Sequence, residues 1–182
     1  MLQITIPSRE VYDEETNLFF ETKEYNLKME HSLLSISKWE SKYHTHFLLN
    51  KGEKPHTSSQ MLYYFKCMTL NQNIPDIVYG ILDKKTVLKI HRYIEDPMTA
   101  TTVSSKNLPR KEIITSELIY YWMTAFNIPF ECEKWHINRL LMLIKVCNAM
   151  NNPPKNSRPD IAARLKLNEQ RLAAEKAKRG IQ

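Results

Sequence analysis

The apolar residues of the chain change their spacing once. Residues 2–6 and 25–29 alternate apolar and polar side chains, and a short apolar run lies at 18–22. Such alternation is typical of half-buried strands, and the acidic, turn-prone residues 12–17 favour an antiparallel hairpin or meander. Farther along, apolar residues recur every three or four positions, which indicates helices. The sequence therefore predicts an α+β, predominantly α-helical fold, with a small N-terminal antiparallel β element at about 1–30.

Capping signals divide the rest of the body into helices. Ser37 and Glu40 have the spacing of a capping box, so a helix is expected to begin between residues 32 and 38 and to end near Leu49. Later helix signals are Thr57 with Gln60, Pro75 in a first turn, and Asp83 before a pattern that ends at Asp96 and Pro97. These signals predict a helical part at about 32–150.

The two most strongly patterned helices follow a polar stretch at 98–110. Their apolar stripes are Leu118, Ile119, Trp122, Met123 and Phe126 in the first, and Ile137, Leu140, Leu141, Ile144 and Cys147 in the second. Their short connection makes them neighbours in space. The run Asn151–Pro154 then breaks the second helix. The predicted globular body is therefore 1–152, and the predicted basic C-terminal helical tail is 153–182.

Length and composition fit one folded body with an appendage. A chain of 182 residues that is 42% hydrophobic can bury a core of its own. No window approaches the roughly 18 consecutive apolar residues of a membrane span, and the start lacks the basic-then-apolar order of a secretory signal. The cysteines, Cys67, Cys132 and Cys147, are widely spaced, which favours reduced thiols. We expect a cytosolic protein without a membrane partner.

The positive charge is concentrated at the C-terminal end. From residue 155 onward the sequence holds eight basic and three acidic residues, so most of the formal net charge of +6 belongs to the tail. Arg164, Lys166 and Arg171 are its candidate partner-binding residues. Nucleic-acid-binding proteins usually carry a basic stripe on the folded surface, which makes nucleic acid the less favoured partner. The tail is either a tether for an acidic partner or a helix kept solvated by its charges.

Sequence signals for catalysis, cofactors and metals are weak. The three glycines, Gly52, Gly80 and Gly180, are isolated, whereas a phosphate-binding loop needs several close together. No nucleophile motif is present. Cys132 and His136 are four residues apart and could face one metal ion from a helix, but no second pair of ligands accompanies them. The sequence thus predicts no catalytic, cofactor-binding or metal-binding residues, and a protein that is not an enzyme.

Six aromatic residues lie within sixteen positions near the end of the body. They are Tyr120, Tyr121, Trp122, Phe126, Phe130 and Trp135. On one helix, Tyr120 and Tyr121 cannot both share the face of Trp122, so some rings must point away from that face. Those rings either pack against other helices or form an exposed apolar groove for a partner segment. The candidate partner-binding residues of such a groove are Tyr120, Tyr121, Phe130 and Trp135.

Parts of the sequence resemble small proteins that tailed bacteriophages encode near their tail genes. The resemblance lies in Ser35–Lys42, Glu117–Met123, Ile128–Glu131 and Lys134–Leu141. Together with the N-terminal strands and the basic tail it covers most of the chain, which is similar to the short form of a tail assembly chaperone. The resemblance implies a non-enzymatic protein of the host cytoplasm that binds the tape measure protein and helps the tail tube assemble around it.

Two other functions stay open beside the chaperone role. One is a nucleic-acid-binding phage or prophage protein that uses its C-terminal helix on phosphates, and the other is a structural component of the virion neck or tail. A steep salt dependence of DNA binding would favour the first, and recovery in purified particles would favour the second. An apolar, helix-rich client demands exposed apolar surface and charge for solubility, and the aromatic cluster and the basic tail are candidates for these.

Overall fold

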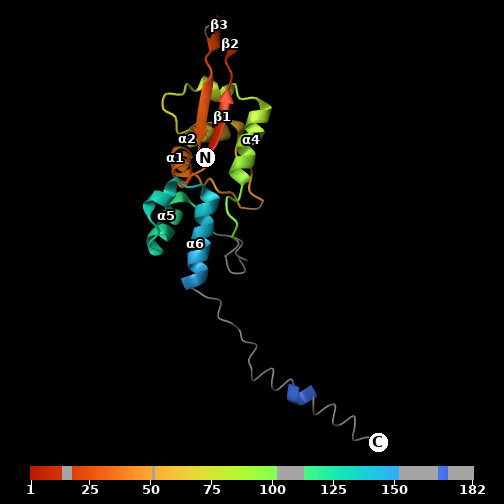
Figure 1. Ribbon diagram of the computed structural model, residues 1–182, viewed down its shortest axis with the longest axis vertical. Helices are drawn as coiled ribbons and strands as arrows, with labels where there is room; N and C mark the ends of the chain where they lie inside the picture. The colour runs from red at the N-terminus through yellow and green to blue at the C-terminus, as the bar shows by residue number, and fades with distance from the viewer. Residues whose placement is uncertain (14–17, 51, 102–112, 152–167, 172–182) are drawn as a thin grey trace, which may run out of the picture. The chain divides into compact units, whose positions relative to one another are not determined.

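The computed structural model describes residues 1–13, 18–50, 52–101, 113–151 and 168–171. Its elements are β1 (Leu2–Ile6), β2 (Arg9–Asp13), β3 (Leu18–Thr22), β4 (Tyr25–Met29), α1 (Leu33–Tyr43), α2 (Ser58–Met68), α3 (Ile77–Gly80), α4 (Lys84–Glu95), α5 (Ser116–Ala125), the 3-10 helix η1 (Phe130–Lys134) and α6 (Ile137–Asn151) (Figure 1). The predicted fold class is confirmed, since antiparallel strands at the N-terminus precede a mainly helical chain.

The chain divides into two units, each described by itself. The first comprises Met1–Val146 and the second Cys147–Gln182. Helix α6 runs across this division to Asn151. The boundary predicted between residues 152 and 153 falls outside the described ranges and stays a prediction.

The four strands form one long antiparallel ribbon. β1 pairs with β4, and β2 pairs with β3. Leu2 lies opposite Met29 in the first ladder and Arg9 opposite Thr22 in the second, so the same register continues from one ladder into the other. The ladders are separated at Pro7, which has no backbone N–H to donate. The ribbon is therefore a single hairpin with an interruption halfway.

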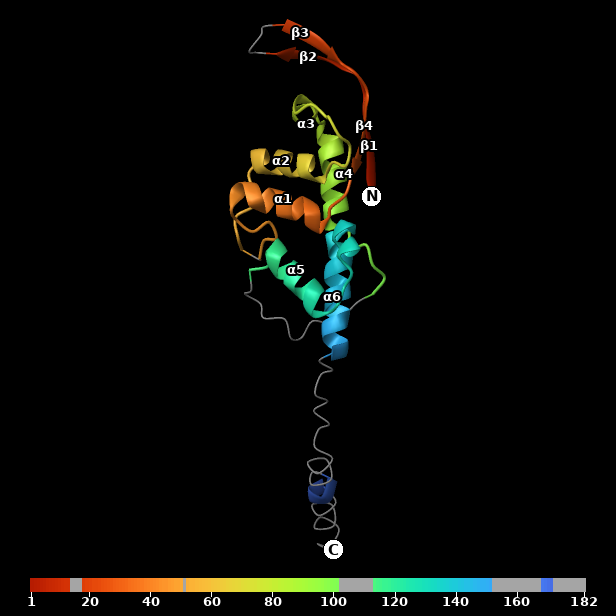
Figure 2. The same cartoon turned by 90° about the vertical axis from the view of Figure 1, so that its left-hand side faces the viewer.

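The base of this ribbon packs on the helices of the first unit. Its inward side chains are Ile4, Ile6, Leu27 and Met29, all of which are buried. β1 contacts α4, and β4 is joined to the end of α2 by the backbone N–H of Leu70, which donates to the Lys28 carbonyl at 2.8 Å. β2 and β3 instead extend past the helices, as Figure 2 shows. We call this outer half, β2 with β3, the arm.

Helix α1 begins at a cap other than the predicted one. Ser32 is the N-cap, and its side chain accepts a hydrogen bond from the backbone N–H of Ser35. The capping box predicted for Ser37 and Glu40 is therefore wrong. Both residues lie inside the helix, and the Glu40 carboxylate is buried.

Helix α1 also ends earlier than predicted. Its last residue is Tyr43 and not a residue near Leu49. His44 takes a left-handed backbone conformation, with φ of 52°, and its N–H bonds to the Glu40 carbonyl. A left-handed residue at this position closes a helix because it turns the chain away while satisfying a terminal carbonyl.

The predicted caps of α2 and α4 are confirmed, whereas Pro75 precedes α3 and its N-cap Asp76 and does not lie in the first turn. Thr57 opens α2 with a capping box, and Asp83 opens α4 by accepting a hydrogen bond from the N–H of Thr86. Helix α4 ends at Glu95, with Asp96 as its C-cap immediately before Pro97. In each case the signal and its partner are close together in the sequence, so local chemistry is sufficient to fix the boundary.

Helices α5 and α6 are neighbours in sequence joined through η1. Thr115 caps α5 with its side chain, and both α5 and η1 contact α1. Cys132 lies in η1 and His136 lies before the first residue of α6. These two residues therefore do not share a regular α-helix, contrary to the reading of their four-residue spacing.

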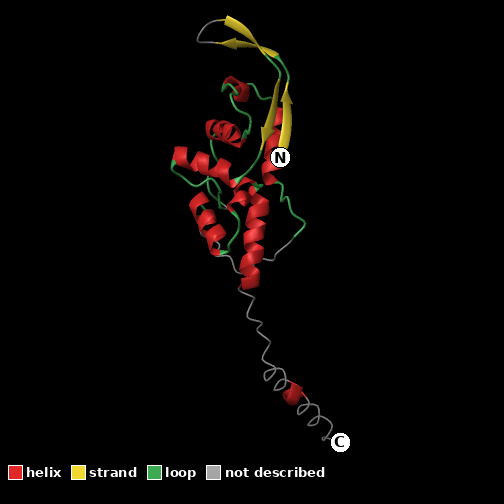
Figure 3. Cartoon of the chain, turned by 60° about the vertical axis from the view of Figure 1, so that its left-hand side comes forward, coloured by secondary structure: helices red, strands yellow, loops and turns green. Residues whose placement is uncertain are grey.

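The core of the first unit takes side chains from the ribbon and from the helices around it. Figure 3 shows the backbone of the ribbon and of these helices. The largest fully buried side chains of the core are Trp39, Tyr64, Phe65, Leu27, Met29, Leu33, Ile36, Met68, Ile90, Ile119, Met123 and Ile137. The indole N–H of Trp39 donates to the Gln60 carbonyl at 3.0 Å, which satisfies the polar edge of this ring. The core thus connects elements that are distant in sequence.

Candidate functional site

Helix α5 is apolar around most of its circumference but buries one stripe. The buried residues are Ser116, Ile119 and Met123. Leu118 and Trp122 are half-buried, and the side chain of Tyr121 is 66% exposed. A helix that is apolar on all sides is normally enclosed by other elements. The uncovered apolar side of α5 is therefore the candidate docking surface of this unit.

Two of the predicted partner-binding residues, one in α5 and one in η1, lie close together. The ring centroids of Tyr120 in α5 and Phe130 in η1 are 6.3 Å apart. The Tyr120 hydroxyl donates to Glu133 at 2.9 Å, which holds the ring across the junction of the two helices. Burial and then the Glu133 carboxylate raise the pKa of Tyr120 to about 12, so the hydroxyl remains a donor at neutral pH. Phe130 is 56% exposed.

The other two predicted residues of this cluster have different surroundings. Trp135 is half-buried, and the guanidinium of Arg139 lies 4.2 Å from the centroid of its ring. In the described part of the chain, neither Tyr121 nor Trp135 makes a ring contact with Tyr120. We define the α5–η1 surface by the predicted residues that belong to α5 and η1, which are Tyr120, Tyr121 and Phe130, whereas Trp135 follows the end of η1 and lies outside this definition.

The candidate residues of the tail are described only in part. Arg171 belongs to a short helical segment at 168–171, all of which is exposed. Arg164 and Lys166 lie outside the described residues, as does most of the predicted C-terminal helix. Their role as partner-binding residues stays a prediction.

A buried carboxylate holds α5 against α1. Glu40 accepts the backbone N–H of Phe47 and the backbone N–H of Ser116, each at 2.8 Å. Ser116 is the first residue of α5, where backbone N–H groups lack partners within the helix. A carboxylate at this end also interacts favourably with the helix dipole. The sequence predicted a capping role for Glu40, but the spacing from Ser37 placed this role at the start of the first helix, whereas the carboxylate binds the start of α5.

A buried histidine pair lies between α1, α2 and the start of α6. The rings of His31 and His136 meet edge to face with centroids 5.0 Å apart. Burial and then the charge of His136 lower the pKa of His31 to about 3. Because His31 is held neutral, its Nδ1 can accept a hydrogen bond from the hydroxyl of Tyr64, which lies 2.5 Å away.

His136 is satisfied in its neutral form as well. Its Nε2 lies 2.9 Å from the Tyr93 carbonyl, to which only an N–H can donate, and its Nδ1 accepts the backbone N–H of Asn138 at 3.3 Å. Desolvation lowers the pKa of His136. The sequence offered no sign of this pairing, since its two histidines are more than a hundred positions apart.

The neighbouring carboxylate of Glu30 links three parts of the fold. It accepts the hydroxyl of Tyr93 at 2.6 Å and forms an ion pair with the amino group of Met1 at 2.9 Å. Burial, and then the hydrogen bond to Glu30, raise the pKa of the Tyr93 hydroxyl. All of these polar groups are engaged with one another, which marks the cluster as a structural element of the core.

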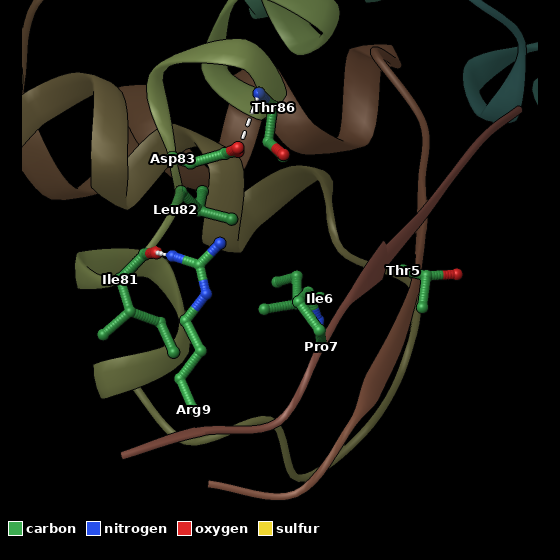
Figure 4. A pocket seen from close by; sticks show the side chains of 8 residues that line it. All are labelled: Thr5, Ile6, Pro7, Arg9, Ile81, Leu82, Asp83 and Thr86. Atoms are coloured by element: carbon green, nitrogen blue, oxygen red, sulfur yellow. Dashed lines mark hydrogen bonds between the residues drawn. The ribbon is translucent and has the colours of Figure 1, made fainter. Parts of the chain in front are cut away.

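A small hollow of about 160 Å³ lies where the arm leaves the helices (Figure 4). Its lining residues are Thr5, Ile6, Pro7, Arg9, Ile81, Leu82, Asp83 and Thr86. The guanidinium of Arg9 donates to the Ile81 carbonyl at 3.4 Å, and the Asp83 carboxylate caps α4. Ligand pockets usually measure about 300–1,000 Å³. We therefore interpret the hollow as the anchor point of the arm and assign it no ligand.

The described ranges contain no group of three or more His, Cys, Asp or Glu side chains that could hold a metal ion. The same part of the chain contains no helix long and apolar enough to cross a membrane. Comparisons with protein-family models, curated proteins and solved structures give no match. Function is therefore inferred from the surfaces of the molecule and from the sequence resemblance.

Proposed function

We propose that the protein is a non-enzymatic binding protein that holds an apolar helical segment of a protein partner on its α5–η1 surface. The observation that carries this proposal is that α5 is apolar on nearly all sides yet buries one stripe. The ring of Tyr121 is exposed on this uncovered side, and the ring of Phe130, in the following η1, is exposed as well. A partner helix with apolar residues at three- and four-residue spacing would cover such a surface, as in helix-in-groove recognition.

The sequence resemblance narrows the partner to the tape measure protein. In this proposal the chain acts as a tail assembly chaperone in the host cytoplasm. A long helical client with exposed apolar residues aggregates unless they are covered, and the α5–η1 surface provides an apolar cover. Glu40 supports this role, because its two hydrogen bonds fix the start of α5 to α1 and so present the surface on a rigid support.

Co-expression with the tape measure protein of the same phage tests the proposal. We expect the full chain to keep this client in the supernatant and to co-purify with it. The double variant Tyr121→Ser with Phe130→Ser should lose capture, since burying one large apolar side chain contributes about 1.5–3 kcal/mol. The affinity of the purified pair should fall by at least about tenfold, which corresponds to 1.4 kcal/mol.

The matched control is Leu88→Ser on α4. Leu88 is 50% exposed, so its replacement removes a comparable apolar group from a different face. Capture should survive this change. If the Tyr121 and Phe130 variant, correctly folded by circular dichroism, captures the client as well as the control does, the α5–η1 surface is not the docking site. If the full chain binds DNA with a steep salt dependence and does not bind the client, the nucleic-acid function replaces the chaperone.

A further inference from the structure

The ring of His136 caps the start of α6. This helix begins at Ile137, and the ring Nδ1 of His136 accepts the backbone N–H of Asn138 at 3.3 Å. The His136 carbonyl accepts the N–H of Leu140 at 3.1 Å. The first N–H groups of a helix have no partner inside it, so a side-chain acceptor here stabilises the first turn. Unlike a hydroxyl or an amide, a histidine ring loses its acceptor when it gains a proton.

The residues around this cap also attach α6 to the end of α4. The other ring nitrogen of His136, Nε2, donates to the Tyr93 carbonyl at 2.9 Å. The side-chain amide of Asn138 donates to the carbonyls of Ile94 and Asp96 at 3.1 and 2.8 Å. The last carbonyls of α4, which lack partners within the helix, are therefore satisfied from the start of α6.

Residues 136–138 also meet the segment between β4 and α1. The Ile137 N–H donates to the His31 carbonyl at 2.7 Å, and Ser32 forms an antiparallel bridge with His136. The rings of His31 and His136 are in edge-to-face contact. We call residues 136–138 the α6 junction, because they join α6 both to α4 and to this segment.

A proton on His136 would disturb the α6 junction at its cap. The Nδ1 would become a donor and could no longer accept the Asn138 N–H. A positive charge at the N-terminus of α6 is also unfavourable beside the helix dipole. The ring is buried, so the charge would have little access to water. Each of these effects favours an open junction in which the protonated ring is hydrated.

Charges of both signs surround the two rings. The titratable and charged groups that face them are the amino group of Met1, Glu30, Tyr64, Tyr93 and Asp96. Burial, the largest effect, lowers the pKa of His136, although the Tyr93 carbonyl and the carboxylates of Glu30 and Asp96 act in the opposite direction. The closed junction therefore excludes a proton that the hydrated ring binds at about pH 6.5.

We propose that the α6 junction is an acid-sensitive contact, which opens locally on acidification while the rest of the first unit stays folded. Local opening hydrates His136 as global unfolding does, but it breaks fewer contacts. The stabilisation of the closed junction is fully present above about pH 6.5 and is lost as the pH falls below this value. This inference does not depend on the α5–η1 surface or on its partner.

Native-state hydrogen exchange of the full chain tests this opening. Protection factors, which correct for the intrinsic effect of pH on exchange, are measured at pH 7 and pH 5.5. We expect those of the Asn138 and Leu140 amides to fall about tenfold at the lower pH, as the protonation of one hydrated histidine predicts. A urea concentration too low to unfold the protein should leave their exchange unchanged and accelerate that of α2, because a local opening exposes little surface.

Two histidine variants separate the cap from other titrating groups. His136→Asn keeps a side-chain acceptor for the α6 cap but does not titrate, so its fall in protection should be about tenfold smaller than in the wild type. His44→Asn changes an exposed histidine at the end of α1 and should retain the full fall. A folded His136→Asn variant that retains the full fall would overturn the proposal.

The wild-type protein alone also decides the question. Equal protection of the α6 amides at both pH values would show that His136 does not control the junction. An equal urea dependence of the α6 and α2 amides would show that only global unfolding exposes it. Either result would overturn the proposal, and neither requires a variant to fold.

Discussion

His31 shows how one buried side chain makes the stability of the fold depend on pH. Its ring is enclosed by Tyr64, Phe47 and His136, and burial lowers its pKa to about 3. In the unfolded chain the same group titrates near 6.5. The unfolded state therefore binds a proton below pH 6.5 that the folded state does not bind. The stabilisation of the fold by the neutral His31 ring is fully present above pH 6.5 and is lost as the pH falls from 6.5 toward 3.

We therefore predict that the free energy of unfolding decreases below pH 6.5. Each buried neutral histidine adds a slope of up to about 1.4 kcal/mol per pH unit, and His136 acts in the same direction because its pKa is also lowered. In His31→Gln the amide oxygen can still accept the Tyr64 hydroxyl, but the group no longer titrates. Urea unfolding between pH 5 and 6.5 should show a shallower slope for this variant.

His44→Asn is the matched control for this measurement. His44 is exposed at the left-handed end of α1, a conformation that Asn tolerates. Its replacement should leave the slope as in the wild type. An unchanged slope in His31→Gln would mean that the buried ring does not set the acid limit of the fold.

Single residues also show where sequence reasoning reached its limit. Thr57 and Asp83 were correctly assigned as caps because each bonds to a residue three positions away. Glu40 was misassigned because one of its partners, Ser116, lies 76 positions along the chain. For Thr57 and Asp83, as for Glu40, the residue type indicated a capping role. Only the tertiary fold shows which helix end receives the carboxylate.

At the scale of elements, α5 combines a buried structural stripe with the proposed docking surface. Ile119 and Met123 were expected in the core and are buried, whereas Leu118, Trp122 and Phe126 belong to the predicted stripe but are half-buried. A broad apolar pattern predicts a helix well, but it cannot show which part of that helix other elements cover. The exposed rings of the α5–η1 surface follow from this incomplete cover.

We predict different outcomes for two truncations within α5. Ile119→Ala should lower the free energy of unfolding by about 2–5 kcal/mol, because it opens a cavity in the core. Tyr121→Ala should change it by less than about 0.5 kcal/mol, as is usual for exposed sites, and should weaken capture of the partner. Urea unfolding and a binding titration on the same samples measure both effects. Equal losses of stability would place Tyr121 in the core and remove it from the docking surface.

The ribbon shows a second limit of what the sequence pattern can predict about single elements. Strands at 2–6 and 25–29 were recognised from alternation, and the same rule gives their buried residues correctly. β2 was not recognised, because its sequence is polar apart from Val11 and Tyr12. Its pairing with β3 continues the register of β1 and β4, so the strand is defined by its partner more than by its own pattern.

At the scale of the whole molecule, the core lies within the first unit. Every buried hydrophobic residue of the described ranges lies before Cys147. Truncation after residue 152 should therefore keep a cooperative thermal transition. Its midpoint should lie within about 3 °C of the full chain, since a shift of this size corresponds to roughly 1 kcal/mol. An unfolded or aggregated product would show that the tail contributes to the fold.

The proposed binding of the tape measure protein to the α5–η1 surface is tested most directly by hydrogen exchange of the full chain with and without that protein. Covered backbone amides exchange more slowly, so the bound partner leaves a footprint on the chain. We predict protection of α5 and η1, residues 116–134, and unchanged exchange in α4. A stable complex in which 116–134 exchanges as in the free protein would contradict the account.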